Sequence, residues 1–525
     1  MTPDLPVAGE LLPLSRSLVA YPDPVALFSR LCDEGRRDHT LLLESADAST
    51  KQTERSFLLT RCALQATCRG RQVRVSALSD GGVATLGWLH ERLAASAAVV
   101  AWNGPDVVVD YPAPPVGDAE ARLRAPSPTD VLRALVGQLR PLARPAPQTV
   151  LVAGVFAYDM LAVYEELPEV PDGPDDAADF TFWLPEEVVV VDHRRGTTRI
   201  LVHVLGGERA ETRFHDAVRR VSELVSVVET TPTQGDPSPA APDLGQARVD
   251  LSDDEFAAVV KRLKERIVTG DVFQIVPSRR FSLPCPDPLS AYRRLRELNP
   301  SPYMFYVNGA DMILLGASPE TAVQVEGDPP RVIIRPIAGT ARRGLDPSGA
   351  IDADLDGRLE TELRLDEKEL AEHMMLIDLA RNDVARVSRA GTRHVSRLLA
   401  VDRYSHVMHL VSEVTGELRE DLDALHAYVA SMNMGTLVGA PKLRAAELLR
   451  RIEPTRRGPY GGAVGYIADD GTMDSAIVIR SAVVRDGVAH VRAGAGVVFD
   501  SDPQAEATET RRKAAAVLRA LGGRP

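Results

Sequence analysis

The sequence of 525 residues lacks most of the signals that mark secreted, membrane-spanning or nucleic-acid-binding proteins. Its four cysteines are too few for a disulfide framework and form no CxxC pair, so we expect a reducing cytoplasm. No uncharged apolar run approaches the roughly 20 residues of a membrane-spanning helix, and Met1–Pro22 holds no basic segment of a secretory signal. The net charge of −13 would repel a phosphate backbone. Neither a membrane nor nucleic acid is therefore expected as a partner.

The sequence does contain ample material for folded domains, since 44% of its residues are hydrophobic and 26% are charged. Residues 230–247 contain four prolines and almost no large apolar side chain, which is typical of a linker. We therefore expect an N-terminal region of residues 1–229 and a C-terminal region of residues 248–525.

Hydrophobic periodicity predicts strands in runs between helices, which favours an α+β fold with largely antiparallel sheets. One helix is clearly marked at Asp253–Thr269, because Ser252 is a candidate N-cap and Glu255 follows three residues later. Further helices are expected at Asp366–Val387, Pro441–Ile452 and Pro503–Leu521, and strands at Thr40–Glu44, Gln72–Leu78, Thr198–Leu205, Val272–Pro277, Met304–Asn308, Met312–Ala317, His406–Val414, Ser475–Val484 and Ala489–Ala493.

Two of the expected helices carry pairs of glutamates three residues apart, so that each pair shares one helix face. The pairs are Glu369 with Glu372 and Glu506 with Glu509. Such faces are commonly solvated, because glutamate favours helices and normally points to water. Four carboxylates from two helices can also form an oxygen-ligand site for Mg²⁺ beside an anionic substrate. The apolar run after Glu372 indicates that its helix is buried on most sides.

An arginine and several glycine turns could contact an anion. Arg480 lies among alanine and valine residues on one face of the expected strand Ser475–Val484, so its guanidinium needs a carboxylate of either the protein or a ligand. Glycine turns, which are either plain turns or backbone cradles for an anion, occur at Gly339-Thr340, Gly435-Thr436 and Gly494-Ala495-Gly496.

Histidines and one absence also bear on the chemistry. His406 and His409 lie an odd number of residues apart in an expected strand, so they face opposite sides, and one can be a base in a cleft while the other is structural. Release of ammonia from glutamine needs an activated nucleophile, typically a cysteine at a tight glycine turn, and none of the four cysteines has that context. Any ammonia that the chain uses must come from solution or from another subunit.

A series of short segments occurs in a distinctive order and spacing. They are Leu42–Ala46, Phe273–Val276, Asn299–Met304, Gly316–Glu320, Pro336–Thr340, Glu369–His373, Asp378–Asp383, Tyr404–His409, Gly435–Lys442, Tyr460–Gly465, Ile479–Arg480 and Gly494–Glu509. Together they resemble the chorismate-utilising enzymes and, within them, the large subunits of anthranilate synthases. The resemblance runs through almost the whole C-terminal region and is looser in the N-terminal region.

The resemblance implies a fold in which large, largely antiparallel sheets pack as a sandwich with helices outside, in two interlocked regions. It implies a Mg²⁺-dependent lyase that converts chorismate and ammonia to anthranilate and pyruvate, the first step of tryptophan biosynthesis. Ammonia would come from a partner glutamine amidotransferase, so a hetero-oligomer is expected. The family also implies feedback inhibition by L-tryptophan.

The resemblance implies roles for single residues as well. Ammonia adds at ring C2 as the C4 hydroxyl leaves, with Glu320 as candidate acid, and His409 is the candidate base for the C2 proton when pyruvate is lost; Thr436 joins them as a catalytic candidate. The implied substrate ligands are Gly339, Thr340, Tyr460, Arg480, Gly494, Ala495 and Gly496. The implied metal ligands are Glu372 and Glu509, with Glu369 and Glu506 beside them or acting through water. The implied tryptophan site comprises Glu44, Ser45, Pro302, Tyr303 and Met304.

Two positions separate this chain from other members of the family. Isochorismate-forming relatives carry a water-activating lysine where this chain has Gln274, and aminodeoxychorismate synthases carry a lysine in the motif where this chain has Ala338. Both differences favour amination at C2, and His409 favours completion of anthranilate. The alternatives are a 2-amino-2-deoxyisochorismate synthase of a secondary-metabolite pathway and a catalytically silent subunit that binds tryptophan and a partner. Val438 stands where many relatives have serine, which leaves the packing of its loop open.

Overall fold

The computed structural model describes residues 4–46, 53–95, 98–115, 117–235, 237–346, 348–403 and 407–525. Among these residues, 23 strands join one hydrogen-bonded network. Neighbouring strands are antiparallel apart from two short parallel pairings, β1 (Glu10–Leu18) with β7 (Arg140–Pro141) and β11 (Gly245–Gln246) with β27 (Gly523–Arg524). The predicted α+β class with largely antiparallel sheets is therefore confirmed.

Strands from the two ends of the sequence pair with each other. Strand β2 (Thr40–Ala46) pairs with β15 (Tyr303–Asn308), and β8 (Leu151–Phe156) pairs with β23 (Ala463–Ala468). On its other edge β2 pairs with the long strand β3 (Thr53–Arg69). These pairings bring sequence-distant side chains onto one surface.

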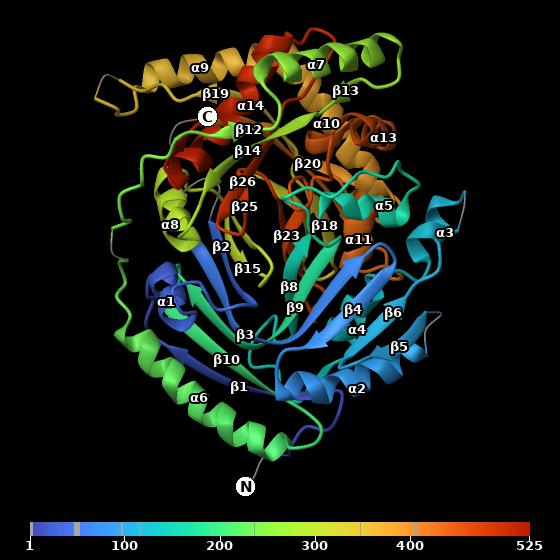
Figure 1. The fold of residues 1–525 in the computed structure, drawn as a ribbon, viewed down its shortest axis with the longest axis vertical. Coiled ribbons are helices and arrows are strands. Elements are labelled where there is room, and N and C mark those ends of the chain that lie inside the picture. The colour runs from blue at the N-terminus through green and yellow to red at the C-terminus, as the bar shows by residue number, and fades with distance from the viewer. Residues whose placement is uncertain are drawn as a thin grey trace.

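Helices cover the two ends of the molecule (Figure 1). The helices α7 (Asp253–Val268), α9 (Ala353–Leu365), α10 (Glu367–Ala385) and α14 (Pro503–Leu521) lie at the upper end of the view, and α2 (Asp80–Ala94) and α6 (Ala210–Thr230) lie at the lower end. Helix α7 begins with the predicted capping box, in which Glu255 N donates to Ser252 Oγ and Ser252 N donates to the Glu255 carboxylate. The predicted helices at the acidic pairs are thus present with nearly the expected bounds.

The prediction of one strand at Ser475–Val484 is wrong. The chain forms β24 (Met473–Ile477) and β25 (Ser481–Arg485), and Arg480 between them has a φ of 49°. This left-handed conformation cannot continue a strand. It is held by backbone contacts with other segments, among them Ala317 N donating to Arg480 O at 3.1 Å. Arg480 therefore does not share a strand face with its alanine and valine neighbours.

Two other strands differ in extent from the prediction. The segment predicted as Val272–Pro277 contains only β13 (Gln274–Ile275), which pairs with the equally short β22 (Gly439–Ala440). Strand β21 (Val407–Glu417) confirms the strand predicted at His406–Val414, although His406 itself lies outside the described residues. Pairing over two residues limits β13, because a strand lasts only as far as its partner does.

The described part of the segment 230–247 runs along the outside of the molecule without a helix or strand between α6 and β11 (Figure 1). It is attached at both ends, since Asp23 N donates to Pro232 O and Leu244 N donates to Gly522 O. In the described ranges, no helix combines the length and the apolar character needed to cross a membrane.

The largest apolar cluster lies beneath the elements that carry the predicted site. It includes Ile377 of α10, Val414 of β21, Ile477 of β24 and Ala507 of α14. The strands β16 (Ile313–Ser318) and β17 (Thr321–Glu326) meet at a turn above this cluster, and β19 (Ile337–Arg342) pairs with β21. These elements fix the backbone positions of Glu320 and His409.

Candidate functional site

Glu320 lies in the turn between β16 and β17 and is only 7% exposed. Thr436 Oγ1 donates to Glu320 Oε1 at 3.3 Å. Burial raises the pKa of Glu320 to about 8, although the hydrogen bond from Thr436 and the charges of Arg480 and Lys513 act to lower it. Glu320 therefore keeps its proton at neutral pH, which is the state that a general acid needs.

His409 is buried on β21 beside Thr340 of β19, with its Nδ1 atom 2.9 Å from Thr340 Oγ1. In the tautomer whose Nδ1–H donates to this hydroxyl, Nε2 carries the lone pair that a base needs. The neighbouring Gly339 has a φ of 74°, and a Cβ atom there would come within 3.4 Å of Glu369 Oε2. Strand β19 therefore brings the histidine and the first acidic pair into the same neighbourhood.

The two acidic pairs approach each other from α10 and α14, and all four side chains are partly buried. Burial raises the pKa of Glu369, and the charge of Glu509 raises it further. Burial likewise raises the pKa of Glu372, with a further increase from Glu506. Within the described residues, however, no three His, Cys, Asp or Glu side chains lie close enough together to hold a metal ion. The four carboxylates nevertheless fit Mg²⁺ chemically, because a divalent cation among oxygen ligands would relieve this repulsion.

Lys513 is a cation of the site that the motifs did not single out. It lies one turn after Glu509 on α14, with Nζ 3.9 Å from Glu509 Oε1, and it donates to Gly494 O at 3.2 Å. Its charge acts to lower the pKa of both Glu320 and Glu369, so it lies near the candidate acid and near the first acidic pair. The sequence signal that could have identified Lys513 is its spacing of four residues from Glu509, which places both side chains on one face of the helix.

Tyr460 and the glycine turn at 494–496 lie side by side. Tyr460 is buried, and a Cβ atom on Gly494 would come within 3.1 Å of the Tyr460 hydroxyl. A Cβ atom on Gly496 would come within 2.8 Å of Gln274 Nε2. Gln274, whose amide cannot act as a base, therefore lies next to the turn.

Two predicted substrate ligands differ from expectation in their surroundings. The amide of Ala495 donates to Pro277 O at 3.1 Å, so in this structure it is engaged within the chain. Arg480 is half-buried in the break between β24 and β25, and its charge acts on the pKa of Glu320. The break thus places Arg480 near Glu320, a position that the predicted continuous strand Ser475–Val484 did not indicate.

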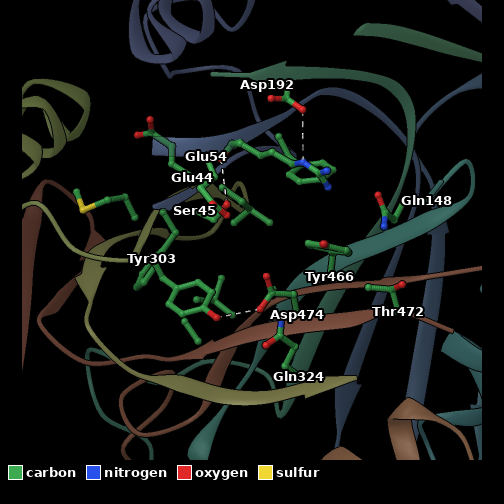
Figure 2. Close-up of a pocket in the computed structure, with 18 of the residues that line it drawn as sticks. Glu44, Ser45, Glu54, Gln148, Asp192, Tyr303, Gln324, Tyr466, Thr472 and Asp474 are labelled. Atoms are coloured by element: carbon green, nitrogen blue, oxygen red, sulfur yellow. Dashed lines mark hydrogen bonds and ion pairs between the residues drawn. The ribbon is translucent and has the colours of Figure 1, made fainter. Parts of the chain in front are cut away.

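A separate cavity of about 670 Å³ lies between strands of the two regions (Figure 2). Four of the five residues predicted for tryptophan line it, namely Glu44 and Ser45 of β2 and Tyr303 and Met304 of β15. In the pairing of these strands Ser45 lies opposite Tyr303 and Glu44 opposite Met304. Pro302 is not among the lining residues. The register of one strand pair therefore assembles most of the predicted regulatory motif.

Acidic side chains contribute to the polarity of this cavity, together with Arg55, Arg194 and Arg195. Tyr292 Oη donates to Glu44 Oε1 at 2.6 Å, and Arg296 Nη2 lies 3.3 Å from Glu44 Oε2. Burial raises the pKa of Asp474 to about 6, while its Oδ1 atom accepts a hydrogen bond from Tyr303 Oη at 3.0 Å. The sequence motifs did not identify Asp474. It belongs to β24, whereas the predicted tryptophan-site residues that line the cavity belong to β2 and β15 (Figure 2).

Known proteins resemble the chain over most of its length. Residues 110–519 match the family model described as chorismate binding enzyme. Anthranilate synthase component 1 of Vibrio cholerae is 50% identical over 502 residues, which cover 95% of this chain and 94% of that protein. The crystal structure of anthranilate synthase component I from Streptococcus pneumoniae matches with a TM-score of 0.68 at 29% identity and covers 88% of this chain and 91% of its own.

A more distant solved structure shows the same fold. The menaquinone-specific isochorismate synthase of Escherichia coli matches with a TM-score of 0.67 at 16% identity, covering 99% of this chain and 96% of its own. The chain is thus an enzyme that belongs to the family of chorismate-binding enzymes, as its motifs predicted, and within that family it is similar to component I of anthranilate synthase.

Proposed function

We propose that the chain catalyses the Mg²⁺-dependent conversion of chorismate and ammonia to anthranilate and pyruvate, the first step of tryptophan biosynthesis. The observation that carries this proposal is Glu320, a buried acid whose pKa is raised to about 8. A hydroxyl group leaves a ring readily only with a proton, which a carboxylic acid that is still protonated at neutral pH can donate. The similarity to anthranilate synthase component 1 of Vibrio cholerae along nearly the whole chain supports the same reaction.

The proposed reaction has two steps. Ammonia adds at ring C2 while Glu320 protonates the departing C4 hydroxyl, and Arg480 and Lys513 offer positive charge to the two carboxylates of chorismate. His409, oriented by Thr340, then takes the C2 proton while the C–O bond to the enolpyruvyl group breaks, and the released enolpyruvate takes up a proton to become pyruvate. The position of Gln274 next to the glycine turn supports ammonia as the nucleophile, because its amide cannot activate water.

We infer that Glu372 and Glu509 would hold Mg²⁺, with Glu369 and Glu506 beside them. When bound, the ion would supply positive charge that binds a substrate carboxylate and stabilises negative charge developing on the ring. The support is the approach of partly buried like charges from α10 and α14, whose side chains now lie near Lys368 and Lys513.

We expect Glu372→Gln to raise the Mg²⁺ concentration for half-maximal activity by roughly tenfold to hundredfold, the range typical of weakened metal sites. The midpoint of thermal unfolding should change little, because the substitution keeps the shape of a partly buried side chain. Titration of activity with Mg²⁺ measures the effect, and Glu367→Gln, on an exposed position of the same helix, is the matched control. A Mg²⁺ requirement equal to that of wild type would remove Glu372 from the metal site.

We infer that ammonia comes from a partner glutamine amidotransferase. All four cysteines are buried and unpaired, and burial raises the pKa of Cys32 and Cys285 to about 12. Neither thiol can therefore act as the nucleophile that glutamine hydrolysis needs, and burial also raises the pKa values of Cys62 and Cys68 well above the ordinary value of a thiol. Unpaired thiols also support a cytoplasmic enzyme, since thiols stay reduced there.

The proposed function is tested by mixing the chain with chorismate, Mg²⁺ and an ammonium salt at mildly alkaline pH, where part of the ammonium is free ammonia. We expect fluorescent anthranilate to form together with pyruvate. Mass spectrometry that instead detects an aminated product with its enolpyruvyl group intact would favour the 2-amino-2-deoxyisochorismate synthase. Absence of any product, with or without an amidotransferase, would refute an enzymatic role for the chain in this reaction.

A further inference from the structure

Glu453 and Arg457 form a buried ion pair that is not among the predicted substrate ligands. They are 8% and 2% exposed, and Glu453 directly follows α13 (Lys442–Ile452). Arg457 Nε donates to Glu453 Oε2 at 2.7 Å, and Arg457 Nη2 donates to Glu453 Oε1 at 2.6 Å. This bidentate geometry compensates the cost of burying both charges.

Arg457 also binds two backbone carbonyl groups from separate segments. Its Nη1 donates to Leu437 O at 2.7 Å and its Nη2 to Val276 O at 2.6 Å. Leu437 directly follows Thr436, whose hydroxyl donates to the candidate acid, and Val276 lies two residues after Gln274. One planar guanidinium therefore fixes the spacing of two segments of the site.

Glu453 reaches a third segment. Its Oε1 accepts hydrogen bonds from Ser278 N at 2.8 Å and from Ser278 Oγ at 2.9 Å. Ser278 is the strand partner of Gly494, the first residue of the glycine turn. The guanidinium carbon of the pair lies 4.4 Å from the ring centre of Tyr158 and 5.9 Å from that of Tyr460.

We propose that Arg457 and Glu453 are positioning residues, which hold Thr436, the glycine turn at 494–496 and Tyr460 in the mutual arrangement that binds chorismate. The proposal rests on the proposed function, because that function assigns those groups to the substrate and the acid. The pair makes four hydrogen bonds to other segments in addition to the two between its own side chains. Arg457 donates two of them to carbonyl groups, Glu453 accepts two from Ser278, and the guanidinium also lies beside the ring of Tyr460. A displacement of such segments by about 1 Å is enough to cost a large part of the rate of an enzyme.

Arg457→Lys tests the proposal, because one ammonium group cannot span Glu453 and two diverging carbonyl groups. We expect KM for chorismate to rise by roughly tenfold or more, as for misplaced binding groups. We also expect the alkaline limb of kcat to move to higher pH, since Thr436 would no longer lower the pKa of Glu320. Arg220→Lys is the matched control, because Arg220 makes two hydrogen bonds to buried Glu187 in the N-terminal region.

If Arg457 had a purely structural role, Arg457→Lys would lower the unfolding midpoint, as Arg220→Lys does, but would leave KM and the pH profile of the folded fraction unchanged. That result would overturn the proposal. If Arg457→Lys does not fold, Ser278→Ala decides, because it removes only the hydroxyl bond to Glu453. A several-fold rise in KM for this variant would support the proposal, and an unchanged KM would overturn it. Wild-type protein that forms no anthranilate would instead refute the proposed function.

Discussion

Glu320→Gln is expected to lower kcat for anthranilate formation by about 10²- to 10⁴-fold, the usual contribution of a general acid, with little change in KM for chorismate. Glutamine has nearly the same shape and can still accept the hydrogen bond from Thr436. It cannot, however, release a proton to the departing C4 hydroxyl. Initial rates of anthranilate fluorescence measure the effect, with Glu265→Gln at an exposed position of α7 as the control. A variant with near-wild-type kcat would exclude Glu320 as the acid.

The same substitution should change the pH dependence of both activity and stability. Wild-type kcat should fall as pH rises through about 8, where Glu320 loses its proton, and the residual activity of the variant should lack this limb. Between pH 4.5 and about 8 the folded state keeps a proton on Glu320 that the unfolded chain has lost, so wild-type stability decreases as pH rises. Glu320→Gln removes this pH-dependent decrease in stability. The unfolding midpoint of the variant should therefore exceed that of wild type by an amount that grows towards pH 8. A less stable variant at pH 8 would contradict the raised pKa.

Local features of the fold could be predicted from the sequence because their cause lies within a few residues. The capping box at Ser252 and the bounds of Pro503–Leu521 follow from cap residues and helical periodicity, and both are confirmed. The break at Arg480 could not be predicted in this way, because the run Ser475–Val484 has a strand-like pattern throughout. Contacts with distant segments interrupt the strand, since Gly461 N donates to Val478 O and Val478 N donates to Gly462 O.

In the candidate site as well, local spacing could be predicted from the sequence, but contacts between distant segments could not. The spacing of Glu369 with Glu372 and of Glu506 with Glu509 defines two helix faces, but only the tertiary structure determines that these faces approach each other. The ion pair of Arg457 with Glu453 has helical spacing and no other local signal. Its importance comes from the carbonyl groups and the serine that it binds in other parts of the chain.

Hydrogen bonds connect the cavity in Figure 2 with the segments that hold the candidate acid. Tyr303 Oη donates to Asp474 Oδ1 and lies 3.0 Å from Thr321 Oγ1, and Thr321 directly follows Glu320. Asp474 belongs to β24, and Ile477 N at the end of this strand donates to Glu320 O at 3.0 Å. A ligand that displaced the Tyr303 ring would therefore act on both segments that hold Glu320. Such coupling between two sites typically changes affinity by about 5- to 150-fold.

Ser45→Tyr is therefore expected to raise the concentration of L-tryptophan for half-maximal inhibition by about 100-fold while turnover of chorismate stays near wild type. Ser45 lines the cavity opposite Tyr303, so a larger side chain would occupy volume that tryptophan, the inhibitor implied by the family resemblance, would need. Inhibition curves at fixed chorismate measure the effect, and Ser15→Tyr on an exposed position of β1 is the control. Unchanged inhibition would exclude this cavity as the tryptophan site. A parallel loss of turnover in Ser45→Tyr, absent from the control, would instead mean that the cavity and the catalytic residues cannot be perturbed separately, because the strands that they share transmit any change in packing.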